Sequence, residues 1–165
     1  MTETPQPVQI AALAWGVKQS FRSYVEATGG TIEVGAEATR AEDGGFVFQA
    51  APDSDLSLAA DGTLQGVGKF LGEVKFDSHG GMLKVFLADP ILEVRESGAV
   101  LTVADTPKRN YRVEVATLDL AALVREDAGA VVAPAALAMF GIQWLGDHYP
   151  LKTPLDPVRL TPAAA

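Results

Sequence analysis

Residues 66–76 read GVGKFLGEVKF, a stretch with the spacing of a β-strand. Phe70, Val74 and Phe76 stand at even intervals, so in an extended chain their side chains share one face. Similar short apolar runs occur at residues 31–34, 46–49, 83–88, 91–95, 100–104 and 112–118. Glycine, aspartate and proline pairs separate most of them, which is turn chemistry. The sequence therefore predicts a mainly β fold with short α-helices, a single domain whose antiparallel sheets are sandwich-like.

The size and charge of the chain limit the classes of ligand that it is expected to bind. Its 165 residues, 48% hydrophobic and 21% charged, are enough for one well-buried core. The formal net charge of -8 opposes binding to nucleic acid or anionic membranes, because their phosphate groups would be repelled. A dianionic ligand meets the same repulsion, so its binding would need apolar burial, a metal bond or a local cation, for which Arg22 and Lys84 are candidates.

The absence of cysteine excludes several kinds of site. Disulfides, thiolate-bound iron, iron–sulfur clusters and covalent haem attachment all need a thiol, and the chain has none. The first residues, MTETPQP, include no basic or apolar segment typical of a secretory signal. As written, the chain is therefore expected to be cytoplasmic, and the alternative is an exported protein whose signal has been removed.

Residues 128–146 are free of charge over nearly the length of a membrane span. Because Pro134 and Gln143 interrupt this stretch, a buried strand, turn and helix is favoured over a transmembrane segment. An alanine-rich helix is expected from about 133 to 140. The tail at 149–158 contains several prolines and is expected to be extended.

Residues 13–27 are expected to form the first helix. Their apolar side chains recur at three- and four-residue steps, the period of one helix face, and a glycine pair follows. These apolar residues are Leu13, Val17, Phe21, Tyr24 and Val25. Tyr24 lies near the end of the stripe. Considered alone, it is interpreted as a tyrosine that covers the core and leaves its hydroxyl in water.

The two histidines, His79 and His148, are too few for a usual zinc site in a chain without thiols. The sequence also contains no nucleophile elbow, P-loop or dinucleotide-binding motif. His79 precedes Gly80-Gly81 between two expected strands, so a tight turn presents its side chain. Considered alone, it is interpreted as a surface histidine of a turn.

Several motifs follow one another in a specific order along the chain. They are LAWGVKQSFRSY at 13–24, FDSHGGML at 76–83, Asp-Pro at 89–90, Phe-Gly at 140–141, Tyr-Pro at 149–150 and LDPV at 155–158. Together they resemble the HtaA family of haem-uptake domains. The resemblance implies an HtaA-like haem-binding domain at 13–160, an N-terminal extension at 1–12 and a C-terminal tail at 161–165.

The same resemblance implies a ligand and a site. The ligand is one ferric haem b, whose iron is bound by Tyr24 while His79 supports that tyrosine through a hydrogen bond. Further residues near these motifs are expected to contact the haem; they are Val17, Ser20, Phe21, Arg22 and Met82. Two departures from the family pattern, Asp77-Ser78 before His79 and a longer link at 142–148, bear on the turn and on the pocket rim.

The expected function is haem binding for uptake, transfer or storage, without enzymatic activity. Two alternatives stay open. One is a haem-degrading or peroxidase-like enzyme, since tyrosine-ligated iron also occurs in catalases. The other is a non-haem interaction domain of the same fold. Haem and other haem-uptake proteins are the partners that the resemblance implies, and the family is usually secreted or associated with the cell envelope.

Overall fold

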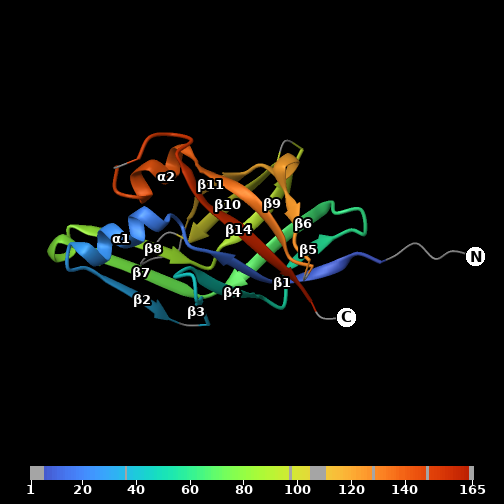
Figure 1. Ribbon diagram of the computed structural model, residues 1–165, viewed down its shortest axis with the longest axis horizontal. Coiled ribbons are helices and arrows are strands. Elements are labelled where there is room, and N and C mark those ends of the chain that lie inside the picture. Colours follow the sequence, from blue (N-terminus) through green and yellow to red (C-terminus); the bar gives the residue numbers. More distant parts are fainter. Residues whose placement is uncertain are drawn as a thin grey trace, which may run out of the picture.

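The strands of the computed structural model close into a barrel (Figure 1). The structure describes residues 6–35, 37–96, 98–104, 111–127, 129–147 and 149–163. Within these residues, eight antiparallel strands form a ring. In order of pairing they are β1 (Val8–Trp15), β5 (Asp55–Leu58), β6 (Leu64–Leu71), β9 (Ile91–Arg95), β10 (Gly98–Ala104), β11 (Arg112–Leu118), β13 (Val131–Leu137) and β14 (Pro154–Pro162). The ring closes because β14 pairs with both β13 and β1.

Three short strands lie beside this ring. β4 (Phe46–Ala50) pairs with β1 and with β6, on the same side of β1 as β5. β3 (Thr39–Arg40) pairs with β4, and β12 (Val124–Arg125) pairs with β13.

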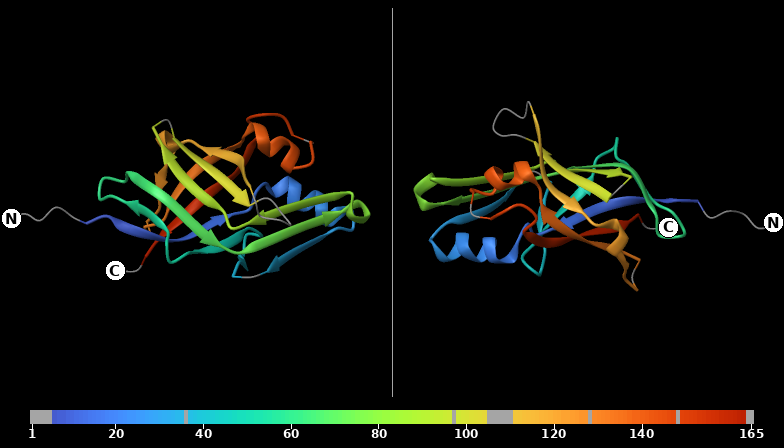
Figure 2. Two further views of the ribbon diagram at one scale, coloured as in Figure 1. Left: turned by 180° about the vertical axis from the view of Figure 1, so that it is seen from behind. Right: turned by 90° about the horizontal axis from the view of Figure 1, so that it is seen from above.

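A second, three-stranded sheet extends from one end of the barrel. In order of pairing it consists of β2 (Thr31–Gly35), β7 (Glu73–Ser78) and β8 (Leu83–Ala88). The two α-helices of the described residues, α1 (Gln19–Ala27) and α2 (Met139–Trp144), lie at the same end (Figures 1 and 2). This end of the molecule therefore combines both helices with the turns of the small sheet.

The expected antiparallel, mainly β architecture with short helices is confirmed, but the sandwich-like arrangement is wrong. Alternating side chains give each strand an inner and an outer face in a sandwich and in a barrel alike. The two differ in whether the edge strands pair. Here the first and last strands, β1 and β14, pair with each other, with Ile10 opposite Pro162 and Ala14 opposite Arg159. This pairing leaves the ring without an edge.

The stretch at 66–76 forms two strands instead of one. Its even spacing continues through Gly72, but that residue has a φ of 140°, a conformation that glycine adopts readily. The amide of Asp89 donates to the Gly72 carbonyl oxygen at 2.9 Å, and the Gly72 amide donates to the Asp89 carboxylate at 3.3 Å. These bonds close the base of the β7–β8 hairpin, where the chain leaves the barrel and returns to it.

The first helix is shorter than expected, because residues 13–15 belong to β1. Trp15 pairs with Phe46 of β4, and its indole nitrogen donates to the Asp156 carbonyl oxygen at 2.8 Å. Val17, with a φ of 64°, breaks the chain direction before α1 begins. The apolar positions at 13 and 15 fit a strand as well as a helix, and the neighbouring strands decide the outcome.

A strand followed by a helix is confirmed within 128–146, but Ala138 alone joins them in place of the expected turn, and the helix at 133–140 is wrong in position. Residues 133–137 belong to β13, where Ala133 and Ala135 are buried between neighbouring strands. The helix begins only at Met139. The expected extended tail is confirmed from Pro154, where β14 begins, whereas residues 150–153 form a turn closed by a bond from the Thr153 amide to the Pro150 carbonyl oxygen at 3.2 Å. No helix in the described part of the chain has the length and hydropathy to span a bilayer.

Aromatic side chains fix α1 and α2 to the sheets. The ring of Phe21 packs edge-on against Phe76 of β7, with ring centroids 5.2 Å apart. Trp144 of α2 stacks on Trp15 at 6.3 Å and donates from its indole nitrogen to the Phe86 carbonyl oxygen of β8 at 2.8 Å. The helices are thereby held against both the barrel and the small sheet.

Candidate functional site

Tyr24 and His79 meet at the end of the molecule where α1 lies beside the β7–β8 hairpin (Figure 1). The Tyr24 hydroxyl oxygen is 2.5 Å from Nε2 of His79, and the two rings have centroids 5.5 Å apart. Tyr24 keeps 37% of its surface exposed. The prediction that these two residues, distant in sequence, face each other is confirmed.

The turn that carries His79 has an unusual backbone. His79, Gly80 and Gly81 have φ values of 54°, 65° and 92°, all in the left-handed region. Glycine adopts that conformation freely, whereas a histidine there costs about 1 kcal/mol. The strain is therefore concentrated at the residue whose ring contacts Tyr24, a pattern often associated with function.

The opposite end of α1 is held by a partly buried ion pair. One guanidinium nitrogen of Arg22 lies 2.5 Å from the Asp156 carboxylate and donates to the Gly16 carbonyl oxygen at 2.7 Å. The other terminal nitrogen donates to the Asp43 carbonyl oxygen at 3.3 Å. Arg22 was expected to contact the ligand, but its side chain is 8% exposed and bound within the protein.

The other expected contacts differ in position. Val17, which precedes α1, and Phe21, which belongs to it, are both buried in the core. Ser20 is exposed on α1, and Met82 is 90% exposed directly after the His79 turn. Of this group, Met82 shares a hollow with His79. His148 lies outside the described residues.

Two hollows adjoin His79. One, of about 470 Å³, is lined by His79, Met82 and Leu83 on the hairpin side and by Gly146 and Asp147 after α2; we call it the His79 hollow. The other, of about 350 Å³, lies between the two glycine turns and is also lined by Lys84. The imidazole therefore stands between an open space toward α2 and a more polar space that includes a lysine.

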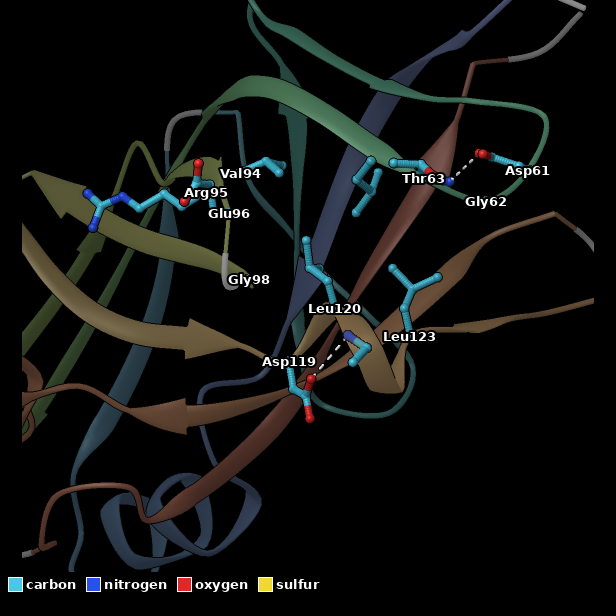
Figure 3. A pocket seen from close by; sticks show the side chains of 12 residues that line it. Asp61, Gly62, Thr63, Val94, Arg95, Glu96, Gly98, Asp119, Leu120 and Leu123 are labelled. Carbon is cyan, nitrogen blue, oxygen red and sulfur yellow. Dashed lines mark hydrogen bonds between the residues drawn. The ribbon is translucent and has the colours of Figure 1, made fainter.

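A larger hollow, of about 560 Å³, lies at the opposite end of the barrel (Figure 3). Its polar side chains serve local structure: Asp61 accepts from the Thr63 amide and Asp119 from the Ala121 amide, each at 3.0 Å. Arg95 pairs with Glu93 of its own strand and with Glu114 of β11, two strands away. The described residues contain no cluster of three or more His, Cys, Asp or Glu side chains suited to a metal ion. The Tyr24–His79 pair is therefore the better candidate site, although its hollows are smaller.

The model of the HtaA family matches residues 10–161. The chain belongs to the HtaA family. Solved structures of HtaA proteins share its fold: the C-terminal domain of HtaA from Corynebacterium glutamicum has a TM-score of 0.68 at 24% identity, covering 95% of this chain and 99% of that one. The N-terminal domain of the same HtaA gives 0.71 at 22% identity, covering 96% and 100%.

A third similar structure is the haem-binding protein HtaB from Corynebacterium glutamicum, with a TM-score of 0.69 at 18% identity and 96% of each chain covered. No curated protein matches the chain. The membership expected from the sequence motifs is thus confirmed. HtaA-family limits at 13 and 160 stay predictions, and β1 begins at Val8, within the expected extension.

Proposed function

We propose that this HtaA domain binds ferric haem for haem uptake, transfer or storage, with Tyr24 as the axial ligand and His79 as the hydrogen-bond partner of that ligand. The contact of 2.5 Å between the Tyr24 oxygen and His79 Nε2 carries the proposal. The name of the similar HtaB structure, a haem-binding protein, supports the choice of ligand.

The donor set suits ferric iron. A phenol is protonated in neutral water and becomes a ligand when the charge of a metal and a nearby hydrogen-bond partner favour its anion. Nε2 of His79 can accept the phenol proton's hydrogen bond, or donate one to the phenolate oxygen. The imidazole would thereby orient the ligand oxygen and adjust its donor strength.

The surroundings of the pair also suit a flat apolar ring. Tyr24 is partly exposed, and Met82 and Leu83 line the hollow that adjoins its partner His79. Haem would supply a ferric centre for the phenolate oxygen and a large apolar surface, which contributes at about 25 cal/mol per Å² buried. Lys84, exposed and next to the His79 turn, is the cation that this geometry offers to a propionate. Such a charge would offset part of the repulsion from a chain of net charge -8.

The experiment is a spectroscopic titration of the apoprotein with hemin. Wild type should give a Soret shift and the charge-transfer bands of high-spin ferric haem bound to tyrosinate. Tyr24→Phe should lose those bands, because phenylalanine has no ligand oxygen. Tyr111→Phe is the matched control, since Tyr111 is 70% exposed and directly precedes β11. Unchanged bands in Tyr24→Phe would sink the ligand assignment, and no spectral change in wild type would sink haem binding.

We propose a carrier and not an enzyme. A peroxidase-like or haem-degrading activity would need an acid–base pair beside the iron. Among the described residues, the His79 hollow is lined by one carboxylate, Asp147, besides His79, whose imidazole already contacts Tyr24. Incubation of the loaded protein with ascorbate should therefore leave the haem intact, and release of a bile pigment would point to the enzyme instead.

A further inference from the structure

Two polar side chains are buried among the described residues. One belongs to α1, and the other contacts the residue directly after that helix. Arg22, 7% exposed, anchors the first half of α1. Ser78, 2% exposed, is the last residue of β7 and precedes His79 directly. Buried polar groups in proteins are almost always hydrogen-bonded. The partner of Ser78 therefore shows what its burial achieves.

That partner is Thr28, the residue after the last turn of α1. The two hydroxyl oxygens are 2.6 Å apart. The Thr28 hydroxyl also lies 2.9 Å from the Tyr24 carbonyl oxygen and 3.1 Å from the Val25 carbonyl oxygen. Carbonyl oxygens only accept, so when the Thr28 proton points to the helix, Ser78 donates to Thr28. A chain of hydrogen bonds thus runs from Ser78 through Thr28 to the backbone of Tyr24.

The two chain segments are also in close contact at this point. A β-carbon added at Gly30 would lie 2.7 Å from the Val25 carbonyl oxygen and 2.9 Å from the Ser78 β-carbon. The absence of a side chain at Gly30 lets the end of α1 approach the end of β7 closely enough for the two hydroxyls to meet. The close approach of the two segments and the hydrogen bond between Ser78 and Thr28 therefore occur at the same place.

The His79 turn needs such an anchor. Three successive left-handed residues follow Ser78, two of them glycines, which place few limits on the backbone. The ring of His79 reaches the Tyr24 hydroxyl from this turn. Without a fixed point immediately before the turn, several backbone conformations would direct the imidazole elsewhere.

We propose that Thr28 and Ser78 are positioning residues, which set the distance and orientation between Tyr24 and His79. The consequence for haem rests on the function proposed above, since it assumes that Tyr24 is the iron ligand. The positioning itself concerns the apoprotein and can be measured there. Removal of a group that orients a metal ligand without binding the metal itself typically lowers metal affinity by about 10- to 100-fold.

The main test variant is Ser78→Ala, which removes one hydroxyl and leaves the bonds of Thr28 to α1 in place. Haem loss to excess apomyoglobin should become about 10-fold faster than in wild type. Thr28→Val should do the same, whereas Thr28→Ser keeps the hydroxyl and should restore the wild-type rate. Ser57→Ala is the control, because Ser57 is a half-buried serine of β5 in the barrel.

Two further measurements separate positioning from stability alone. In the apoprotein, nuclear Overhauser contacts between the Tyr24 and His79 rings should be strong in wild type and weak in Ser78→Ala. In a His79→Ala background, Ser78→Ala should change the haem loss rate by less than about twofold, because the residue it positions is gone. Equal ring contacts and equal loss rates in wild type and Ser78→Ala would overturn the proposal. If wild type binds no haem through Tyr24, the proposed function fails, and the ring contacts in the apoprotein alone decide whether Ser78 positions His79.

Discussion

The carboxylate of Asp156 caps α1 from the last strand of the barrel. One oxygen accepts from the Gln19 amide at 3.0 Å, and the other binds the Arg22 guanidinium one turn later at 2.5 Å. Lys18, the residue before the helix, makes no side-chain cap of its own. A carboxylate at a helix N-terminus also interacts favourably with the helix dipole. The position of the helix that carries Tyr24 is thus set by a residue of β14.

Replacing Asp156 with alanine should destabilise the apoprotein by about 3 kcal/mol, because Arg22 would keep a buried charge without its partner. The measurement is urea unfolding followed by tryptophan fluorescence. The double variant Arg22→Met with Asp156→Leu should recover much of the loss, since it removes both charges and keeps apolar volume. A single variant within 0.5 kcal/mol of wild type would contradict this role for the ion pair.

The exposed carboxyl of Asp53 should show a different, pH-dependent behaviour. Lys69 donates a hydrogen bond to it at 3.0 Å, which lowers the pKa of Asp53 below its ordinary value. A carboxyl with a lowered folded-state pKa stabilises the fold above its unfolded pKa, near 3.8, and this contribution disappears as the pH falls through the folded value. Wild type and Asp53→Asn should therefore differ slightly at pH 7 and converge near pH 2. A difference that grows on acidification would contradict the assignment.

Gly30→Ala tests the close approach of α1 to β7. The new methyl group would meet carbonyl oxygens of Val25 and Asp77, which belong to backbone and cannot rotate away. A loss of about 2 kcal/mol in unfolding free energy is expected from such overpacking. Gly35→Ala is the control, because a β-carbon there has no atom within 4 Å. Equal stability of the two variants would show that the segments separate at little cost.

Met82→Leu should leave the ferric haem spectrum unchanged. Met82 shares the His79 hollow but is 90% exposed, so its sulfur is not held in place as a second axial ligand would be. Leucine keeps the apolar volume and removes the sulfur, and the measurement is the position of the charge-transfer bands at room temperature. A change from high-spin to low-spin bands between the two proteins would instead identify Met82 as a ligand.

The sequence was sufficient for the strands and for the central pair of the site. Alternating apolar residues located most strands, because that pattern is local. The order of motifs predicted that Tyr24 and His79 would meet, and they do. Barrel closure could not be predicted, since the pairing of Ala14 with Arg159 depends on residues at opposite ends of the chain.

The errors near the site have the same origin. Leu13 and Trp15 fit a helix stripe and a strand face equally well, and the left-handed conformation of Val17 that separates strand from helix has no signal in a valine. Thr28 and Ser78 were not identified as a pair, because hydroxyl residues at a helix end and before a turn are common. Asp156 lay within a recognised motif, but only the fold shows that it caps α1.

The pairing of β14 with β1 has a consequence for how the domain is made. Ring closure and the Asp156 cap both depend on Pro154–Pro162, so neither can form before this last strand of the domain has been synthesised. Tyr24 is synthesised early, but the strand that fixes the position of its helix is synthesised last within the domain. If Tyr24 is the ligand proposed above, haem capture therefore requires the last strand of the domain, because a polypeptide that stops before Pro154 has Tyr24 without the frame that holds it.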